Sequence, residues 1–307
     1  MQSHIPDHRP VVLMGNAMLS WLTSRLDDFD LRLADDACEA CQSARVAIAA
    51  SATIDDLFFD RFPAVDYVAA VGSGHENIDI AAARRRGIAV TCNAAGPSED
   101  VADHTVALLL AHHHNLIAND RLIRANAWPI PAQRRSLPEM RVGIVGLGLI
   151  GRAIARRLAI FGCDIRWTGP RRKDAAYAYV PDLIDLADWS DILVIAARAD
   201  STNVDLIGAT VLEALGPTGL LINISRGSIV DEDVLIAMLR DGRLGGAALD
   251  VFKSEPTSGE KWRDVPRTLL TPHMSGYASA TQRNLQNGLA ANISAYFSGE
   301  PLTGRIA

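Results

Sequence analysis

One stretch, residues 141–158, constrains the fold of this chain more than any other part of the sequence. An apolar run leads directly into the glycines of Gly-Leu-Gly-Leu-Ile-Gly, and an amphipathic run follows them. In such a segment Gly146 permits a tight turn, Gly148 lets a ligand approach the backbone, and Gly151 lets a helix pack closely on the strand. The sequence therefore predicts a strand, a turn and a helix in the order that this motif requires.

The start of that helix is a predicted binding site for phosphate groups. Free N–H groups and the positive end of the helix dipole lie together at Leu149 and Ile150. A dinucleotide is the expected ligand. S-adenosylmethionine is the alternative ligand, and a glycine-rich turn used only for packing is the alternative without a ligand.

The segment after the next expected strand, residues 168–173, holds no carboxylate. An NAD enzyme usually places Asp or Glu there, about 20 residues beyond the glycines, to bind the ribose hydroxyls. Here the segment carries Arg171, Arg172 and Lys173 instead, and these cations would attract a 2′-phosphate. We therefore expect NADP(H) in preference to NAD(H), with NAD(H) still possible; the alternative is an exposed basic loop that binds nothing.

Short apolar runs alternate with helical patterns along most of the chain, which predicts parallel sheets covered by helices. The expected strands are 11–14, 46–49, 68–71, 88–91, 142–145, 164–167, 192–196, 220–224, 246–249 and 269–271. The expected helices include 19–26, 78–86, 98–125 and 278–297. The fold class is α/β, with two Rossmann-like or flavodoxin-like parallel-sheet domains and a cleft between them as the ligand site. We expect one domain from residues 1–95 plus 280–307 and a dinucleotide-binding domain from residues 96–279.

Composition excludes several other classes of protein. The 307 residues carry a formal charge of -6, which argues against a general nucleic-acid binder. No apolar run reaches the roughly 18 to 20 residues that span a bilayer, and the polar first ten residues do not resemble a signal peptide. We therefore expect a cytoplasmic protein that binds neither nucleic acid nor membrane.

Neither the cysteines nor the histidines predict a metal site. Cys38 and Cys41 form a Cys-x-x-Cys pair, a pattern of redox or metal sites, but no second pair completes a zinc site. We interpret the pair as two reduced thiols near a helix end. The side chains of residues 112–114, three consecutive histidines, point roughly 100° apart on a helix and cannot converge on one ion.

Polar side chains follow three of the later expected strands. Arg226 comes just after one strand, Asp250 and Glu255 follow the next, and His273 follows the last. Ligands bind outside the carboxyl ends of such strands, so these side chains should converge on the dinucleotide. Together they would supply an acid, the group that orients it and an anchor for a carboxylate.

At this point the chain resembles the D-isomer-specific 2-hydroxyacid dehydrogenase family over nearly its whole length, and within it glyoxylate and hydroxypyruvate reductases most. The resemblance rests on GLGLIG, NISRGSIVDE, ALDVFKSEP and TPHMSG, in that order. It implies that Arg226 binds the substrate carboxylate and polarises the 2-oxo group, and that His273 acts as general acid. It also implies that Glu255 orients His273 and that Asp250 lies near the nicotinamide.

The same resemblance extends to the other expected domain, which would bind substrate. The segment VGSGHENID at residues 71–79 looks like the loop that holds the substrate carboxylate, through the backbone N–H groups of Ser73 and Gly74. A strand-to-helix turn without a ligand is the alternative. His75, Trp128 and Met274 are candidates for the pocket wall.

The remaining cofactor contacts and the assembly also follow from the resemblance. The expected contacts include Ala197, Ile224, Ser225, Ser275 and Gly276. Where the family places Thr-Pro or a similar pair, this chain has Ala197-Arg198, and Arg198 is a further candidate partner for phosphate. A homodimer is expected, with the predicted helix at 98–125 as its interface and with Trp128 reaching the neighbouring subunit.

The resulting functional hypothesis is the NADP(H)-dependent reduction of small 2-oxo acids, such as glyoxylate or hydroxypyruvate, to D-2-hydroxy acids. The alternative is a regulatory protein that senses a dinucleotide and retains the dehydrogenase fold. The presence of Arg226, Glu255 and His273 favours the enzyme, because a sensor has no need of an acid–base pair.

Overall fold

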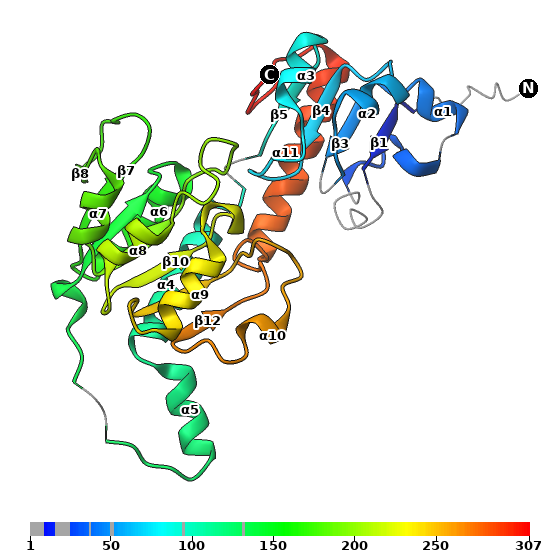
Figure 1. The fold of residues 1–307 in the computed structure, drawn as a ribbon. Coiled ribbons are helices and arrows are strands. Elements are labelled where there is room, and N and C mark those ends of the chain that lie inside the picture. The colour runs from blue at the N-terminus through cyan, green and yellow to red at the C-terminus, as the bar shows by residue number, and fades with distance from the viewer. Residues whose placement is uncertain (1–8, 16–24, 37, 50–51, 94–95, 131–132) are drawn as a thin grey trace, which may run out of the picture. The chain divides into compact units, whose positions relative to one another are not determined.

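A computed structural model describes the whole chain except residues 1–8, 16–24, 37, 50–51, 94–95 and 131–132. The helix predicted at residues 19–26 falls almost entirely outside the described residues. The chain separates into two compact units: residues 1–97 with 278–307 form the first, and residues 98–277 form the second. Each unit contains one parallel sheet with helices packed on it, so the predicted α/β class with two parallel-sheet domains is confirmed (Figure 1).

The first unit is built on a five-stranded parallel sheet in the order β2-β1-β3-β4-β5. The strands are β1 (Val11–Met14), β2 (Asp30–Leu33), β3 (Val46–Ala49), β4 (Tyr67–Ala70) and β5 (Ala89–Thr91). The helices are α1 (Glu39–Gln42), α2 (Asp56–Arg61), α3 (Ile80–Arg85) and α11 (Ser279–Ser298). The C-terminal residues return to this sheet, because the Val90 N–H donates to the carbonyl of Ala307 over 3.2 Å.

The second unit is built on a seven-stranded sheet in the order β12-β11-β10-β9-β6-β7-β8. Its strands are β6 (Arg141–Val145), β7 (Asp164–Thr168), β8 (Ala178–Tyr179), β9 (Ile192–Ile195), β10 (Leu220–Asn223), β11 (Gly246–Leu249) and β12 (Thr268–Leu270). Its α-helices are α4 (Ser98–His113), α5 (Leu116–Arg124), α6 (Leu149–Ile160), α7 (Leu183–Trp189), α8 (Ala209–Leu215), α9 (Glu232–Arg240) and α10 (Gly259–Trp262). The strand order reverses direction at β6, and a doubly wound sheet binds its ligand at such a point.

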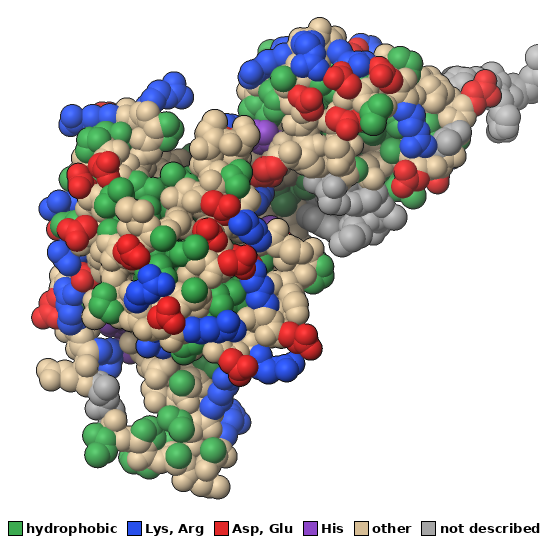
Figure 2. Space-filling view, viewed as in Figure 1, with side chains coloured by type: hydrophobic (Ala, Val, Ile, Leu, Met, Phe, Trp, Pro, Cys, Tyr) green, Lys and Arg blue, Asp and Glu red, His purple; other side chains and the backbone are tan. Residues whose placement is uncertain are grey.

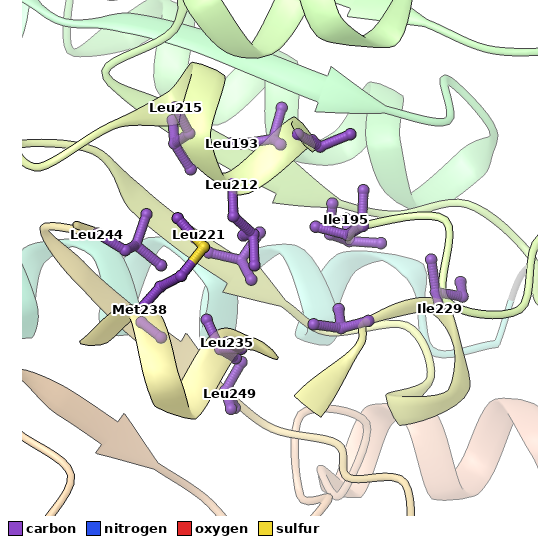
Figure 3. Packing of buried hydrophobic residues seen from close by; sticks show 14 of the residues in the cluster. Leu193, Ile195, Leu212, Leu215, Leu221, Ile229, Leu235, Met238, Leu244 and Leu249 are labelled. Atoms are coloured by element: carbon purple, nitrogen blue, oxygen red, sulfur yellow. The ribbon is translucent and has the colours of Figure 1, made fainter. Parts of the chain in front are cut away.

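The core of the second unit explains why its central strands are apolar without alternation. Every residue of β9, β10 and β11 is buried, because helices cover both faces of this sheet. On one face, Leu193 and Leu221 pack with Leu212 of α8 and with Leu235 and Met238 of α9 (Figure 3). This packing fixes the strand ends from which the polar loops depart.

Two features of the fold differ from the prediction. The helix expected at 98–125 is interrupted, because Asn115 adopts a left-handed φ of 53° between α4 and α5. The strands β2 and β8 were not predicted: β2 alternates charged with apolar residues over only four positions, and β8 has two residues. Four positions are the shortest run in which such an alternation indicates a strand, and two positions carry no pattern.

The histidines at the end of α4 serve the packing of the second unit. His112 Nε2 donates to the carbonyl of Arg267 over 3.2 Å, and its ring occupies the space in which a Cβ on Gly246 would lie 2.2 Å from Nε2. His113 Nε2 contacts the carbonyl of Arg135 at 3.0 Å. Among the described residues no group of three or more metal-binding side chains occurs, and no helix is both long and apolar enough to cross a membrane.

Burial of His112 makes the stability of the fold depend on pH. Burial lowers the pKa of His112, and the hydrogen bond to the Arg267 carbonyl only partly offsets it. The unfolded chain therefore binds more protons than the folded chain as the pH falls below about 6.5, and the contribution of His112 to stability is lost there. We expect the stability advantage of the wild type over His112→Gln, which keeps a donor but does not titrate, to shrink between about pH 8 and about pH 5.5. Urea unfolding at both pH values measures this, and a constant difference would contradict it.

Candidate active site

The glycine turn joins β6 to α6 and is shaped by close backbone contacts. Gly146 has a φ of 97°, and a Cβ there would lie 2.6 Å from the Cα of Ala197. A Cβ on Gly151 would lie 2.1 Å from the carbonyl oxygen of Gly146. Any larger residue at either position would force the turn apart. The turn therefore has one shape, in which α6 begins immediately at the sheet.

The middle glycine of the turn, Gly148, faces open space instead of protein. A Cβ added to Gly148 would meet no atom within 4 Å. The first hydrogen bond of the helix there runs from the Arg152 N–H to the Gly148 carbonyl, at 3.0 Å. The N–H groups of Leu149 and Ile150 precede it and point away from the helix, beside an exposed Leu149 side chain. These amides and the open space fit the diphosphate group of a dinucleotide.

The basic loop after β7 is anchored to the same turn. Lys173 Nζ donates to the carbonyl of Leu147, within the glycine turn, at 2.9 Å. The far end of the loop is tied back by Tyr179 Oη, which donates to the Gly169 carbonyl at 2.9 Å. Arg171 and Arg172 lie exposed between these two ties. Of the three cations, Lys173 orders the loop and the two arginines remain at its surface.

The loops after β10 and β11 touch each other through their backbones. A Cβ on Gly227 would lie 1.9 Å from the carbonyl carbon of Phe252, so only glycine fits beside the β11 loop. The preceding Arg226 is half-buried, and its carbonyl accepts a hydrogen bond from Asn223 Nδ2 at 2.9 Å. Ser225 Oγ donates to the carbonyl of Ala197, which brings the loop after β9 to the same place. Arg226 is thus held at the convergence of three strand ends.

His273 and Glu255 form the pair that the sequence suggested. Nδ1 of His273 lies 2.6 Å from Oε2 of Glu255, and the other carboxylate oxygen accepts the Phe252 N–H at 2.9 Å. A carboxylate only accepts, so Nδ1 carries the hydrogen of this contact. Both side chains are partly exposed, and the second ring nitrogen of His273, Nε2, is the atom left to exchange a proton with a ligand. His273 has a left-handed φ of 49°.

Asp250 holds the backbone that carries His273. The residue is fully buried, and its carboxylate accepts hydrogen bonds from Thr271 Oγ1 at 2.6 Å and from the N–H groups of Met274 and Ser275 at 3.0 Å and 2.9 Å. Its carbonyl accepts the His273 N–H at 2.8 Å. Burial by itself would raise the pKa of Asp250, but the hydrogen bonds outweigh it and hold that pKa well below its usual range.

One contributor to this cluster was not predicted from the sequence. His104 of α4 places Nε2 3.1 Å from Thr271 Oγ1 and 3.5 Å from Asp250 Oδ1. No local pattern connects it to Asp250, because the contact joins residues far apart in the chain.

The predicted substrate loop lies in the first unit. Ser73 and Gly74 are half-buried, and His75 Nδ1 lies 3.2 Å from the Ser73 carbonyl. The Gly72 carbonyl accepts the Asn93 N–H at 2.9 Å, so the loop is fixed to the strand end after β5.

The other predicted contacts differ in exposure. Ile224 and Ser275 are buried and Gly276 is half-buried, whereas the side chains of Met274 and Trp128 are 46% and 88% exposed. Arg198 lies 3.6 Å from the carboxylate of Asp200, so a partner within its own loop already faces it.

Comparison with known proteins places this geometry in a family. The model of the D-isomer specific 2-hydroxyacid dehydrogenase, NAD binding domain, matches residues 106–275. A glyoxylate/hydroxypyruvate reductase A of Arabidopsis thaliana is 38% identical over 256 residues, which cover 82% of each chain. A 2-ketogluconate reductase of Gluconobacter oxydans is 35% identical over 246 residues, 79% of each chain.

Two solved structures also resemble the structure of this chain. The NADPH-dependent glyoxylate/hydroxypyruvate reductase of Sinorhizobium meliloti, in complex with NADP and malonate, matches with a TM-score of 0.88 and 31% identity over 97% of each chain. The 2-hydroxyacid dehydrogenase of Ketogulonicigenium vulgare matches with a TM-score of 0.88 and 34% identity, over 97% of this chain and 98% of that one.

This chain belongs to the D-isomer-specific 2-hydroxyacid dehydrogenase family. It is an oxidoreductase of the type that interconverts 2-hydroxy acids and 2-oxo acids, and its second unit contains the nicotinamide dinucleotide-binding domain.

Proposed function

We propose that this protein reduces small 2-oxo acids, such as glyoxylate or hydroxypyruvate, to D-2-hydroxy acids with NADPH as the preferred reductant. The observation that carries the proposal is the contact between His273 and Glu255, whose loop touches the loop that carries Arg226. The reductases of glyoxylate and hydroxypyruvate among its relatives support the substrate class.

Three residues of the second unit each have one role in the proposed reaction. The guanidinium of Arg226, held in its loop by a hydrogen bond to the Ser225 carbonyl at 2.8 Å, binds the substrate carboxylate and polarises the 2-oxo group. A bound nicotinamide cofactor supplies hydride to the carbonyl carbon. His273 donates the proton on Nε2 to the oxygen at which negative charge develops. Glu255 holds the ring through Nδ1 and stabilises its positive charge before the transfer.

The proposed preference for NADPH rests on the charge of the basic loop. The ribose end of a dinucleotide bound at the glycine turn would reach the end of β7, where Arg171 and Arg172 are exposed and a carboxylate is missing from residues 168–173. The NADP in the Sinorhizobium meliloti reductase supports this preference.

The carboxylate-binding role of Ser73 and Gly74 and the cytoplasmic location stay predictions. So do the place of Asp250 near the nicotinamide and the cofactor contacts of Ala197, Ile224, Ser225, Ser275 and Gly276.

We also propose that the protein is a homodimer in which α5 contacts a second copy of the chain. No residue of α5 is buried, and Leu116, Ile117 and Ile123 are 52%, 47% and 49% exposed. Figure 2 shows hydrophobic side chains gathered on this projecting segment. Exposed large apolar side chains gathered on one element are typical of an interaction site.

Replacing His273 by Gln tests the proposed general acid. We expect turnover to fall by at least about 10²-fold, because the glutamine amide cannot supply the proton, while the affinity for NADPH is nearly unchanged. Steady-state assays with glyoxylate, hydroxypyruvate and phenylpyruvate, together with fluorescence titration of NADPH, measure both quantities. Turnover equal to that of the wild type would remove His273 from its role. If the wild type oxidises neither NADPH nor NADH with any of these acids, the reductase proposal fails and the dinucleotide sensor is favoured.

Replacing both Arg171 and Arg172 by Ala tests the cofactor preference. We expect the KM for NADPH to rise roughly 10-fold or more, because charge-assisted hydrogen bonds to the 2′-phosphate are lost, while the KM for NADH changes little. Arg263→Ala, at an exposed arginine directly after α10 of the same unit, is the matched control. A wild type that prefers NADH, or an equal rise for both cofactors, would contradict the proposal.

The oligomeric state tests the proposed role of α5. We expect light scattering to give about twice the 33.0 kDa of one chain, and the double variant Ile117→Asp with Ile123→Asp to give one chain, because buried carboxylates would lack partners at the interface. Leu57→Asp, at a position 77% exposed on the first unit, is the control and should remain dimeric. A wild type that is monomeric at micromolar concentration would overturn the proposal.

A further inference from the structure

Two neighbouring thiols lie in the first unit, and neither has a role in the dehydrogenase reaction proposed above. Cys38 immediately precedes α1, and Cys41 lies within it. Both are free thiols in this structure. From the sequence we expected two reduced thiols near a helix end, and the structure adds how their side chains are placed.

The pair has one accessible and one inaccessible sulfur. Cys41 is fully buried in the core of the first unit, and its Sγ lies 3.9 Å from the Leu33 carbonyl. Cys38 is half-buried at the edge of the same core. The turn is closed by the Cys41 N–H, which donates to the Cys38 carbonyl at 3.0 Å. The two side chains belong to the same turn and interact directly.

The electrostatic environment shifts the pKa values of the two thiols in opposite directions, and it favours ionisation of Cys38, the less buried one. The hydrogen bond from the Cys41 thiol lowers the pKa of Cys38, and the nearby guanidinium of Arg32 acts in the same direction. Burial raises the pKa of Cys41, and its contact with Cys38 adds to this. Cys38 is therefore the thiol that ionises first, and the more accessible thiolate is the one that reacts.

We propose that Cys38 and Cys41 form a reversible dithiol–disulfide couple, in which Cys38 exchanges with low-molecular-weight disulfides and Cys41 is the resolving thiol. The Cys38 thiolate attacks one sulfur of the external disulfide, which breaks that S–S bond and releases one external thiol. The Cys41 thiolate then attacks the Cys38 sulfur of the mixed disulfide and releases the second. Two protein thiols are oxidised by two electrons, the external disulfide is reduced to two thiols, and the two protons pass to those thiols.

The other two cysteines, Cys92 and Cys163, serve as internal controls. Cys163 is buried in the second unit, where its Sγ lies 3.4 Å from the Leu137 carbonyl. Cys92 is half-buried after β5 of the first unit. Cys38 and Cys41 take no part in the reaction proposed above, so their oxidation can be measured independently of turnover.

Intact mass measured after incubation with oxidised glutathione tests the proposal. We expect the wild type to lose two hydrogen masses without a retained adduct, and excess dithiothreitol to restore the starting mass. In the reduced protein, iodoacetamide should label Cys38 at least about 10-fold faster than Cys41. Cys41→Ser should stop at a glutathione adduct on Cys38, and Cys38→Ser should neither close a disulfide nor retain an adduct on Cys41.

The double variant Cys92→Ser with Cys163→Ser is the matched control and should oxidise as the wild type does. Retention of both thiols by the wild type in oxidised glutathione would overturn the proposal. An adduct confined to Cys92 or Cys163, or a disulfide that still forms in Cys38→Ser, would also overturn it. Because the wild-type masses decide the main point, the proposal remains testable if the buried Cys41→Ser position disrupts folding.

Discussion

The buried carboxylate of Asp250 is the interaction on which the geometry of the active site depends. A desolvated charge is costly unless hydrogen bonds satisfy it, and here Thr271 and the backbone N–H groups of Met274 and Ser275 do so. Since all these donors come from the segment around His273, the carboxylate fixes the backbone of the proposed acid. The left-handed φ of His273, unusual for a residue with a side chain, is maintained by these contacts.

Glycines determine how closely the remaining loops approach. Gly227 allows the loop that carries Arg226 to lie against the backbone of Phe252, in the loop that carries Glu255. Gly146 does the same between the dinucleotide turn and Ala197. Backbone contact replaces side-chain packing at these points. The loops that carry Arg226 and Glu255 consequently lie directly against each other.

Two kinds of group are available to recognise the cofactor: backbone N–H groups at the glycine turn and side chains at the end of β7. The glycine turn offers backbone N–H groups and open space at Gly148, which suit the diphosphate of any nicotinamide dinucleotide. Discrimination between NADP and NAD must then come from side chains at the end of β7, and Lys173 contributes by tying that loop to the turn. Family membership establishes the dehydrogenase class, whereas the preference for NADPH is our proposal and rests on the charge of this loop.

The sequence alone determined the fold class, the dinucleotide turn and the identity of the polar residues at the strand ends. These follow from local rules, because hydrophobic period, glycine spacing and the place where a strand ends are all readable along the chain. The same rules missed β2, whose alternation spans only four positions, and β8, which has two residues. They also missed the break at Asn115, where a single left-handed residue ends α4. Only the tertiary structure decided that His104 faces Asp250, that Lys173 reaches the glycine turn, and that Cys38 and Cys41 differ in burial. Each of these depends on contact between side chains and distant segments, which packing of the whole unit brings together and which no local pattern specifies.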